Sequence, residues 1–309
     1  MKKVLALAAL GAVVLTAAAT AGVSALSGTV TADGSSTVGP YAIAAAEGFQ
    51  KKNKGARVTV GISGTGGGFE RFCRGEIDLA NASRPMKNSE AITCRDKGVK
   101  WVAFTVANDG ISVVASRQNT WVDCLTTAEL KLIWNTGSKV KSWNDVRSSF
   151  PDVPLKLFGP GTDSGTFDFF TEVINGKSKA SRSDYLATED DNVIVNGVAG
   201  ERGGLGYFGF SYFEENASKL KLIRVDSGRG CTAPSVAAVQ KGQYRPLARP
   251  LFIYAKRDSF RRPVVAGYLG YIFNNEKVIA KRSGYIALTD RQLKKARYQY
   301  RQALKANNQ

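Results

Sequence analysis

The sequence predicts an α/β fold, because short β-prone runs alternate with helical patterns along most of the chain. Residues 58–62 alternate in hydrophobicity as a strand does, whereas Ala42, Ala45 and Phe49 recur at helical spacing. Glycine-rich and serine-rich loops separate several of these runs. We therefore predict strands over 29–32, 58–62, 77–80, 101–106, 111–115, 155–158, 220–225 and 251–255, and helices over 41–51, 69–74, 126–134 and from 167 to about 174.

The chain of 309 residues is long enough for about two domains, yet no segment reads as a linker. Asn108, Asp109 and Gly110 predict a turn between the strands at 101–106 and 111–115. Four cysteines allow three pairings, and we favour Cys73–Cys94 and Cys124–Cys231. The second pair would join distant parts of the middle of the chain. We therefore predict two strand crossings near 107 and 250, with lobes formed by 26–107 plus 251–309 and by 108–250.

The N-terminus predicts export. Met1-Lys2-Lys3 precedes an apolar run over 4–21, and Val23-Ser24-Ala25 has the small residues that a signal peptidase recognises. We predict a signal peptide over 1–25 that is cleaved after Ala25, which places the protein in the periplasm or cell envelope, or outside the cell. The alternative is an uncleaved membrane anchor. Export also permits disulfides.

Composition excludes several classes of chemistry. The chain has no His, which removes Ser-His-Asp catalysis, Cys-His catalysis and most catalytic zinc sites. No C-x-x-C spacing occurs, so a cysteine metal cluster is disfavoured, and we predict neither metal nor cofactor. There are 43 Lys plus Arg against 26 Asp plus Glu. The export signal and the absence of a recognisable nucleic-acid motif argue against a nucleic-acid partner.

Much of the excess positive charge lies near the C-terminus. Thr289 and Asp290 are typical of a helix start, and Leu293, Ala296 and Tyr300 then recur at helical spacing. Two interpretations stay open: a solvated outer face of a packed helix, or a surface attracted to an acidic envelope or a membrane partner. The basic residues of this region are Lys277, Lys281, Arg282, Arg291, Lys294, Lys295, Arg297, Arg301 and Lys305.

Three loops rich in Gly, Ser and Thr each lie between a strand and a helix, at 33–37, 63–68 and 161–166. Backbone N–H groups at a helix N-terminus and Ser or Thr hydroxyls are donors that suit an oxyanion. A fourth loop at 81–85 adds Ser83 and Arg84 after a strand. No Lys-Ser/Thr pair follows the glycines as in a Walker A loop, and no G-x-G-x-x-G opens the first helix. The loops predict binding of a small oxyanion.

With these loops, the chain resembles the phosphate-binding subunit of bacterial ABC phosphate importers, the PstS family. The resemblance runs from about Gly28 to at least Ala255. It implies a two-domain periplasmic-binding-protein fold of type II, with two crossing strands as hinge, that closes over phosphate. The blocks that carry it are DGSSTVGP (33–40), GISGTGGGFERF (61–72), IDLANASRP (77–85), GPGTDSGTFDFFTEVI (159–174), GGLGYFGFSY (203–212) and RPLFIYA (249–255).

The resemblance also implies residue roles. One lobe would donate hydrogen bonds to phosphate from Ser36, Thr37 and Thr65. The other lobe would donate from Ser164, Gly165 and Thr166.

The sequence departs from the family pattern at two places. Many members have Asp where Ser83 stands, and Arg where Pro160 or Gly161 stands. Arg84 is our candidate for the missing guanidinium. A carboxylate acceptor would favour protonated phosphate over sulfate, and Asp163 and Asp33 are our candidates for it.

We therefore predict a non-enzymatic, monomeric binder of inorganic phosphate that delivers it to the membrane permease of an ABC transporter. One alternative is a binder of another tetrahedral oxyanion such as sulfate. A second is a secreted hydrolase or phosphatase that uses Ser164 with a Lys base. A third is a surface protein whose anion site is vestigial.

Overall fold

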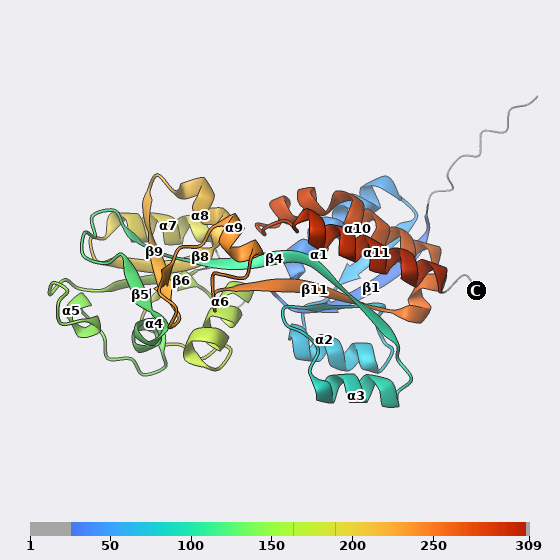
Figure 1. Ribbon diagram of the computed structural model, residues 1–309, viewed down its shortest axis with the longest axis horizontal. Helices are drawn as coiled ribbons and strands as arrows, with labels where there is room; N and C mark the ends of the chain where they lie inside the picture. The colour runs from blue at the N-terminus through green and yellow to red at the C-terminus, as the bar shows by residue number, and fades with distance from the viewer. Residues whose placement is uncertain (1–25, 163, 189, 307–309) are drawn as a thin grey trace, which may run out of the picture.

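The computed structural model describes residues 26–162, 164–188 and 190–306, which form two lobes side by side along the long axis (Figure 1). The predicted signal peptide and Asp163 lie outside the described residues. No helix within the described part of the chain is long and apolar enough to span a membrane. Both predicted disulfides are present: Cys73–Cys94 and Cys124–Cys231.

Lobe I contains a mixed sheet in the order β2-β1-β3-β11-β4. Its first three strands are parallel, and β11 runs antiparallel to both neighbours. Helices α1, α10 and α11 lie over one face of the sheet, and α2 and α3 over the other (Figure 1). The element bounds are β1 Gly28–Gly34, α1 Gly39–Lys52, β2 Ala56–Val60, α2 Gly64–Cys73, β3 Leu79–Ala82, α3 Asn88–Asp96, β4 Trp101–Ser116, β11 Ala248–Lys256, a 3₁₀ turn η2 Arg257–Arg261, α10 Pro263–Arg282 and α11 Asp290–Lys305.

Lobe II is built around the second half of β4, which lies between β8 and β9. Beyond β8 the sheet continues through β6 to β7, and β9 also pairs with β5 and β10. The elements of this lobe are β5 Cys124–Thr126, α4 Thr127–Trp134, α5 Trp143–Val146, β6 Lys156–Pro160, α6 Gly165–Phe170, a π-helical turn η1 Thr171–Asn175, β7 Leu186–Thr188, α7 Asp191–Gly200, β8 Gly204–Gly209, α8 Phe210–Asn216, β9 Leu220–Asp226, β10 Cys231–Thr232 and α9 Val236–Gln240.

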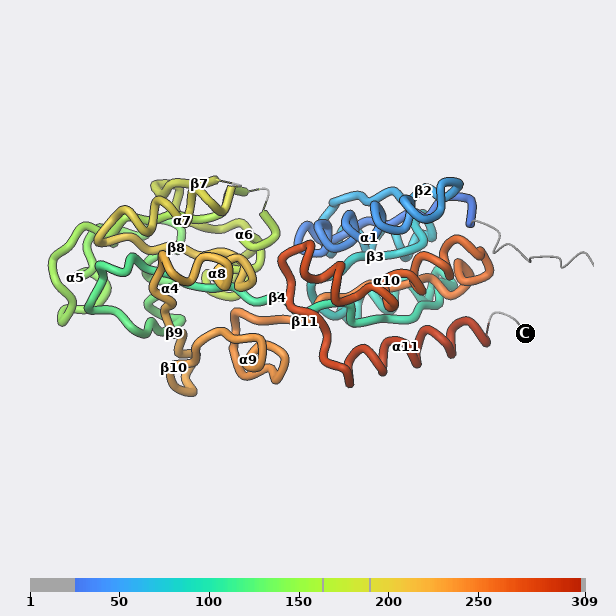
Figure 2. The backbone as a smooth tube through the Cα atoms, turned by 90° about the horizontal axis from the view of Figure 1, so that it is seen from above, coloured from blue at the N-terminus to red at the C-terminus, as the bar shows by residue number. Residues whose placement is uncertain are grey.

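Two antiparallel strands, β4 and β11, cross between the lobes (Figure 2). The sequence prediction of a turn at 108–110 is wrong, because β4 continues through these residues. Asn108 and Asp109 are turn-type residues, but both are buried and their side chains have partners. Asn108 donates to the carbonyl oxygen of Ala287 (3.3 Å), and Asp109 pairs with Arg249 on β11 (3.4 Å). Satisfied polar groups therefore let a turn-like sequence continue as a buried strand.

Each lobe has its own hydrophobic core, and the boundary between the cores lies where β4 and β11 cross. The largest core cluster of lobe I combines β1, β2 and α1 with β11, α10 and α11, so it draws on both ends of the described chain. The largest cluster of lobe II is drawn from residues between 111 and 248, with the addition of Ile286. Each lobe thus buries its own apolar surface, which lets the strands between them act as a hinge.

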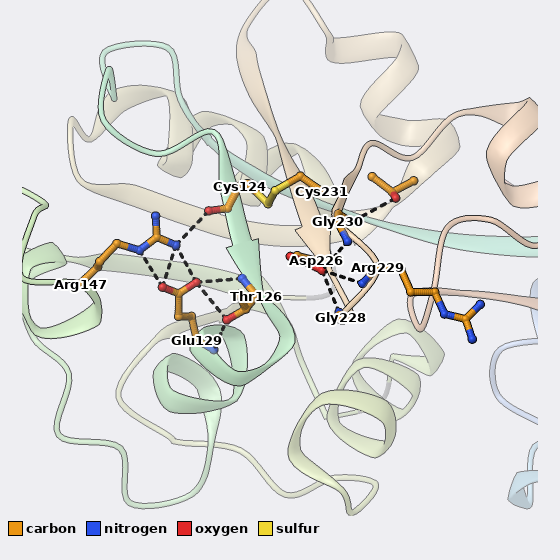
Figure 3. Close-up of a disulfide and its surroundings, with 10 residues drawn as sticks. Cys124, Thr126, Glu129, Arg147, Asp226, Gly228, Arg229, Gly230 and Cys231 are labelled. Carbon is orange, nitrogen blue, oxygen red and sulfur yellow. Dashed lines mark hydrogen bonds and ion pairs between the residues drawn. A yellow bond between two sulfur atoms is a disulfide. The ribbon is translucent and has the colours of Figure 1, made fainter.

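The Cys124–Cys231 disulfide joins β5 to β10, and both strands pair with β9 (Figure 3). Nearby, Arg147 donates to both carboxylate oxygens of Glu129 (2.8 and 2.9 Å). Asp226 accepts three N–H donors from the turn that leads to Cys231, at 2.7 to 3.1 Å. The disulfide therefore ties together the two strands that pair with the end of β9 in lobe II. At the other end of the molecule, Cys73–Cys94 joins α2 to α3.

Candidate functional site

A cavity of about 270 Å³ lies where the strand-to-helix loops of lobe I meet lobe II and the hinge. Lobe I lines it with hydroxyls and backbone, lobe II with carboxylates and an amine, and β11 with one guanidinium. The lining residues are Ser35, Ser36, Thr37, Gly64, Thr65, Gly66, Ser83, Arg84, Asp168, Phe169, Glu172, Ser178, Lys179 and Arg249.

The β1–α1 loop turns sharply at Gly34. Its φ is +139°, and a Cβ there would lie 2.2 Å from the carbonyl oxygen of Asn81, so only glycine fits. The buried Asp33 carboxylate accepts from the N–H groups of Gly34 (2.7 Å) and Ser63 (3.0 Å) and pairs with Arg71. Asp33 does not line the cavity. It joins the first two loops, which is not the proton-acceptor role considered from the sequence.

The first loop also contacts lobe II directly. Thr37 Oγ1 donates to the carbonyl oxygen of Gly165 (3.1 Å), and Ser36 Oγ donates to Asp168 Oδ2 (3.3 Å). A Cβ on Gly165 would lie 2.4 Å from Thr37 N, so glycine is required for this approach. These contacts close the lobes over the cavity.

The second loop and the β3 loop share a hydrogen-bonded pair of hydroxyls. Thr65 Oγ1 lies 3.2 Å from Ser83 Oγ and accepts from Ser83 N at 3.3 Å. Thr65 lies in the first turn of α2, whose N-terminus carries partial positive charge. Thr65 and Ser83 therefore lie side by side on the lobe I wall of the cavity.

Arg249 brings a guanidinium to the cavity from β11, and no role was assigned to it from the sequence. It donates from Nη2 to Thr37 Oγ1 (2.8 Å) and from Nη1 to the carbonyl oxygen of Ser83 (3.3 Å). Its guanidinium lies 3.6 Å from the centre of the Phe169 ring. Arg249 thus touches lobe I, lobe II and the hinge at once.

The charge of Arg249 is balanced from behind by Asp109, 3.4 Å away on β4. Both side chains are nearly inaccessible, at 11% and 4% exposure. Burial lowers the pKa of Arg249 and raises the pKa of Asp109, and each partner opposes the shift of the other. A long, offset pair of this kind leaves N–H groups free to serve a further anion.

Arg84 also lines the cavity, but its guanidinium is engaged by Glu90. The pair is bidentate, with distances of 2.9 and 2.7 Å. The hydrogen bonds that Arg84 donates to the Glu90 carboxylate raise the pKa of Arg84. The Arg84 guanidinium therefore already has a full counter-charge within its own lobe, which makes it a weaker donor to a ligand than Arg249.

The third predicted loop contributes differently from the first two. Ser164 caps α6, because its Oγ accepts from the N–H groups of Thr166 (3.2 Å) and Phe167 (3.5 Å). Thr166 lines a larger interlobe cavity of about 820 Å³, between α8 and the C-terminal end of α10, and not the smaller cavity. The lobe II wall of the smaller cavity comes from the residues after the loop.

Asp168 is the carboxylate at the contact between the lobes. Its Oδ2 accepts from Ser36, whereas Oδ1 is buried with no hydrogen-bond partner among the described residues. The nearest cation is Lys179, whose Nζ lies 3.9 Å from Oδ1. Burial raises the pKa of Asp168, and Lys179 and the Ser36 hydroxyl oppose this shift. Asp168 therefore has a free acceptor atom beside the cavity.

The cavity combines donors with one acceptor. Hydroxyls, helix N-termini and Arg249 can bind anionic oxygens, and Asp168 can accept a proton-bearing oxygen. No group of three or more Cys, Asp or Glu side chains that could hold a metal ion occurs in the part of the chain that the structure describes. The arrangement is suited to a small, partly protonated oxyanion.

Comparison with known proteins agrees with this chemistry. The model of the PBP superfamily domain matches residues 19–276. The protein SphX of Synechococcus elongatus is 49% identical over 262 residues, covering 84% of this chain and 77% of SphX. The phosphate-binding protein PstS of Staphylococcus saprophyticus is 39% identical over 266 residues, covering 84% and 81% of the two chains. A crystal structure of a possible phosphate-binding protein from Planctomyces limnophilus superposes with a TM-score of 0.87 at 46% identity, covering 90% and 99%.

This chain belongs to the PstS/SphX family of phosphate-binding proteins. Members of the family are non-enzymatic binding components of phosphate ABC transporters. The fold and family predicted from the sequence are therefore confirmed, and the hydrolase alternative is wrong.

In this PstS-family chain the cavity is lined by the hydroxyl loops of lobe I and by Arg249 and Asp168, two residues to which no role was assigned from the sequence. Arg249 opens the RPLFIYA block that carried the resemblance, so its presence in a recognised block was a usable signal. Asp168 likewise lies inside the GPGTDSGTFDFFTEVI block, whereas Lys179 lies outside all the blocks that carried the resemblance.

Proposed function

We propose that this protein binds one inorganic phosphate ion in the 270 Å³ cavity and delivers it to the membrane permease of an ABC importer. The observation that carries the site assignment is Arg249, a buried guanidinium that reaches both a hydroxyl and a backbone carbonyl of the opposite loops. An anion placed among these groups would accept hydrogen bonds from the Arg249 N–H groups that Asp109 does not engage.

The ligand set follows from the cavity walls. We assign Arg249, Thr65 and Ser83 as side-chain donors to phosphate. Ser36 and Thr37 would donate through their backbone N–H groups, since their hydroxyls donate to lobe II. Charge-assisted hydrogen bonds contribute about 1.5–3 kcal/mol each, which is enough for micromolar or tighter binding after the cost of closure.

The other residues predicted from the sequence would make only secondary contacts with phosphate. Arg84 would act mainly through its charge, because its guanidinium already donates two hydrogen bonds to Glu90. Ser164, Gly165 and Thr166 stay predictions as direct donors. Gly165 would also stabilise the closed form, because its carbonyl oxygen accepts a hydrogen bond from Thr37 of lobe I.

Asp168 is our candidate for the acceptor that favours phosphate over sulfate. Phosphate keeps a proton near neutral pH and sulfate does not. Asp168 Oδ1, which has no hydrogen-bond partner in the described part of the chain, can accept a hydrogen bond from that proton, whereas it would repel a fully ionised oxygen. Asp163, the other predicted acceptor, stays a prediction.

Delivery would depend on closure. The contacts of Ser36 and Thr37 with lobe II form only when the lobes meet, so phosphate that bridges both walls would favour the closed form. A permease that contacts both lobes can then distinguish loaded from empty protein. We propose that the protein acts as a monomer outside the cytoplasm, after export and cleavage following Ala25.

Calorimetric titration of the purified protein with phosphate, sulfate and arsenate tests the proposal. We expect one phosphate per chain at micromolar affinity or tighter, and sulfate at least tenfold weaker. Absence of a phosphate signal would reject the function. Equal affinity for sulfate would reject the role of Asp168 and retain an oxyanion binder.

A further inference from the structure

Helix α11 presents a row of cations on its outer face. Residues 291, 294, 298, 301 and 305 follow one another at spacings of three or four, so they lie along one side of the helix. At about 1.5 Å per residue the row is about 21 Å long. We call this row, together with the neighbouring exposed Lys295, the α11 stripe: Arg291, Lys294, Lys295, Tyr298, Arg301 and Lys305.

The opposite face of α11 fixes the orientation of the stripe. Leu293, Ala296 and Ala303 are buried against the core. Tyr300 Oη donates to the carbonyl oxygen of Ala266 (2.8 Å), and Arg297 donates to that of Phe273 (2.8 and 3.2 Å). The helix therefore cannot turn its cations inward, and they point away from the body of lobe I.

The stripe cations differ from the other basic residues of this region. Lys277 pairs with Asp290, Arg282 pairs with Glu47, and Arg297 serves the backbone of α10. In contrast, no side-chain hydrogen bond or ion pair is found within the described chain for the five cations of the stripe. Like charges at helical spacing repel one another, so they add nothing to folding stability. An external array of anions would relieve that repulsion.

Two further features favour a membrane surface as that array. Tyr298 is 57% exposed in the middle of the stripe, and tyrosine is enriched at membrane interfaces, where its ring lies at headgroup level. Leu26, the first described residue, packs beside Gly267 of α10, about one turn from the Tyr300 contact at Gly270. The first described residue therefore contacts α10, the helix against which α11 packs.

We propose that the α11 stripe binds the anionic lipid headgroups of the membrane across which the chain is exported. Each Lys or Arg close to an anionic surface adds to the attraction, and the attraction falls with salt. None of the stripe residues lines the 270 Å³ cavity, so the surface and the anion site are separate. Such binding would hold the protein near a permease and would reduce its search to two dimensions.

Vesicle sedimentation of the protein purified after export tests this inference. The probes are vesicles of equal parts phosphatidylglycerol and phosphatidylcholine, and vesicles of phosphatidylcholine alone. The test variant is Lys294→Gln/Arg301→Gln/Lys305→Gln. The matched control is Arg95→Gln/Lys97→Gln/Lys100→Gln, which removes the same charge at α3 on the opposite face of the sheet (Figure 1).

We expect the stripe variant to bind phosphatidylglycerol vesicles at least tenfold more weakly than the wild type at near-physiological salt, and the control to change less than about twofold. Both variants should keep the wild-type affinity for phosphate, which verifies folding and separates this test from the proposed function. Equal losses in the two variants, or no preference of the wild type for phosphatidylglycerol, would overturn the inference. Loss of binding to a soluble anionic polysaccharide with unchanged vesicle binding would also overturn it, in favour of a polymer partner.

Discussion

The two walls of the cavity differ in what they offer an anion. Lobe I supplies hydroxyls and helix N-termini, and lobe II supplies the Asp168 and Glu172 carboxylates with the Lys179 amine. Arg249 stands between them on the hinge. A wall of donors alone would bind any oxyanion, whereas a carboxylate on the facing wall selects one that still carries a proton. The contrast teaches that affinity and selectivity can come from opposite lobes.

Arg249→Ala should have the largest effect on phosphate affinity of the variants considered. Loss of its charge-assisted bonds should weaken phosphate binding roughly a hundredfold. It should also lower the free energy of unfolding by about 3–5 kcal/mol, because Asp109 would be buried without a cation. Calorimetry and chemical denaturation measure the two effects.

The double variant Arg249→Ala/Asp109→Asn separates them. Removing the unpaired charge should restore most of the stability and leave phosphate binding weak. If the double variant binds phosphate as the wild type does, Arg249 supports the fold and does not bind the ligand.

Asp168→Asn should have the next largest effect. Phosphate affinity should fall about tenfold, and sulfate affinity should stay the same or rise, since a repelling carboxylate is gone. Because burial raises the pKa of Asp168, its carboxylate gains a proton at higher pH than an ordinary Asp. The affinity ratio of wild type to variant should therefore decline as the pH falls. Glu172→Gln serves as the control on the same wall, and an equal change there would count against Asp168.

Arg84→Ala should have a smaller effect, about threefold or less on phosphate affinity, because Glu90 already balances its charge. Glu90→Gln would release the guanidinium and should strengthen binding slightly. Titrations of both variants with phosphate distinguish the two arginines. A loss of tenfold or more in Arg84→Ala would return the leading role to the residue chosen from the sequence.

Glu276→Gln should leave phosphate affinity unchanged, since this carboxylate is buried in α10 away from the cavity. Burial raises the pKa of Glu276 from 4.5 to about 7. Between these values the folded chain keeps a proton that the unfolded chain has lost, so stability falls as the pH rises through this window. The loss, on the order of 2–3 kcal/mol by pH 8, should disappear in the variant. Thermal unfolding at pH 5 and pH 8 gives the comparison, and an equal pH dependence in both proteins would contradict it.

Local patterns were sufficient for much of the fold. The first strand-to-helix loop, the helix that starts after Thr289 and both disulfide pairs are found where the sequence predicts them. The loop predicted at 63–68 is wrong over 64–68, because these residues form the first part of α2. Caps, turns and hydrophobic periodicity act over a few residues, so they can be read directly. The turn expected at 108–110 failed because the partners that satisfy Asn108 and Asp109 come from the C-terminal third of the chain.

The same distinction between local patterns and long-range contacts applies to the proposed anion site. By itself the sequence determined that hydroxyl-bearing loops precede helices, that no His-dependent chemistry is available, and which family the chain belongs to. Only the tertiary structure placed the Arg249 guanidinium and the Asp168 carboxylate in the lining of one cavity. Arg249 reaches Thr37 across 212 residues of sequence, and Ser36 reaches Asp168 across 132. Contacts at such separation depend on how two lobes and a shared hinge fold together, and no local spacing encodes them.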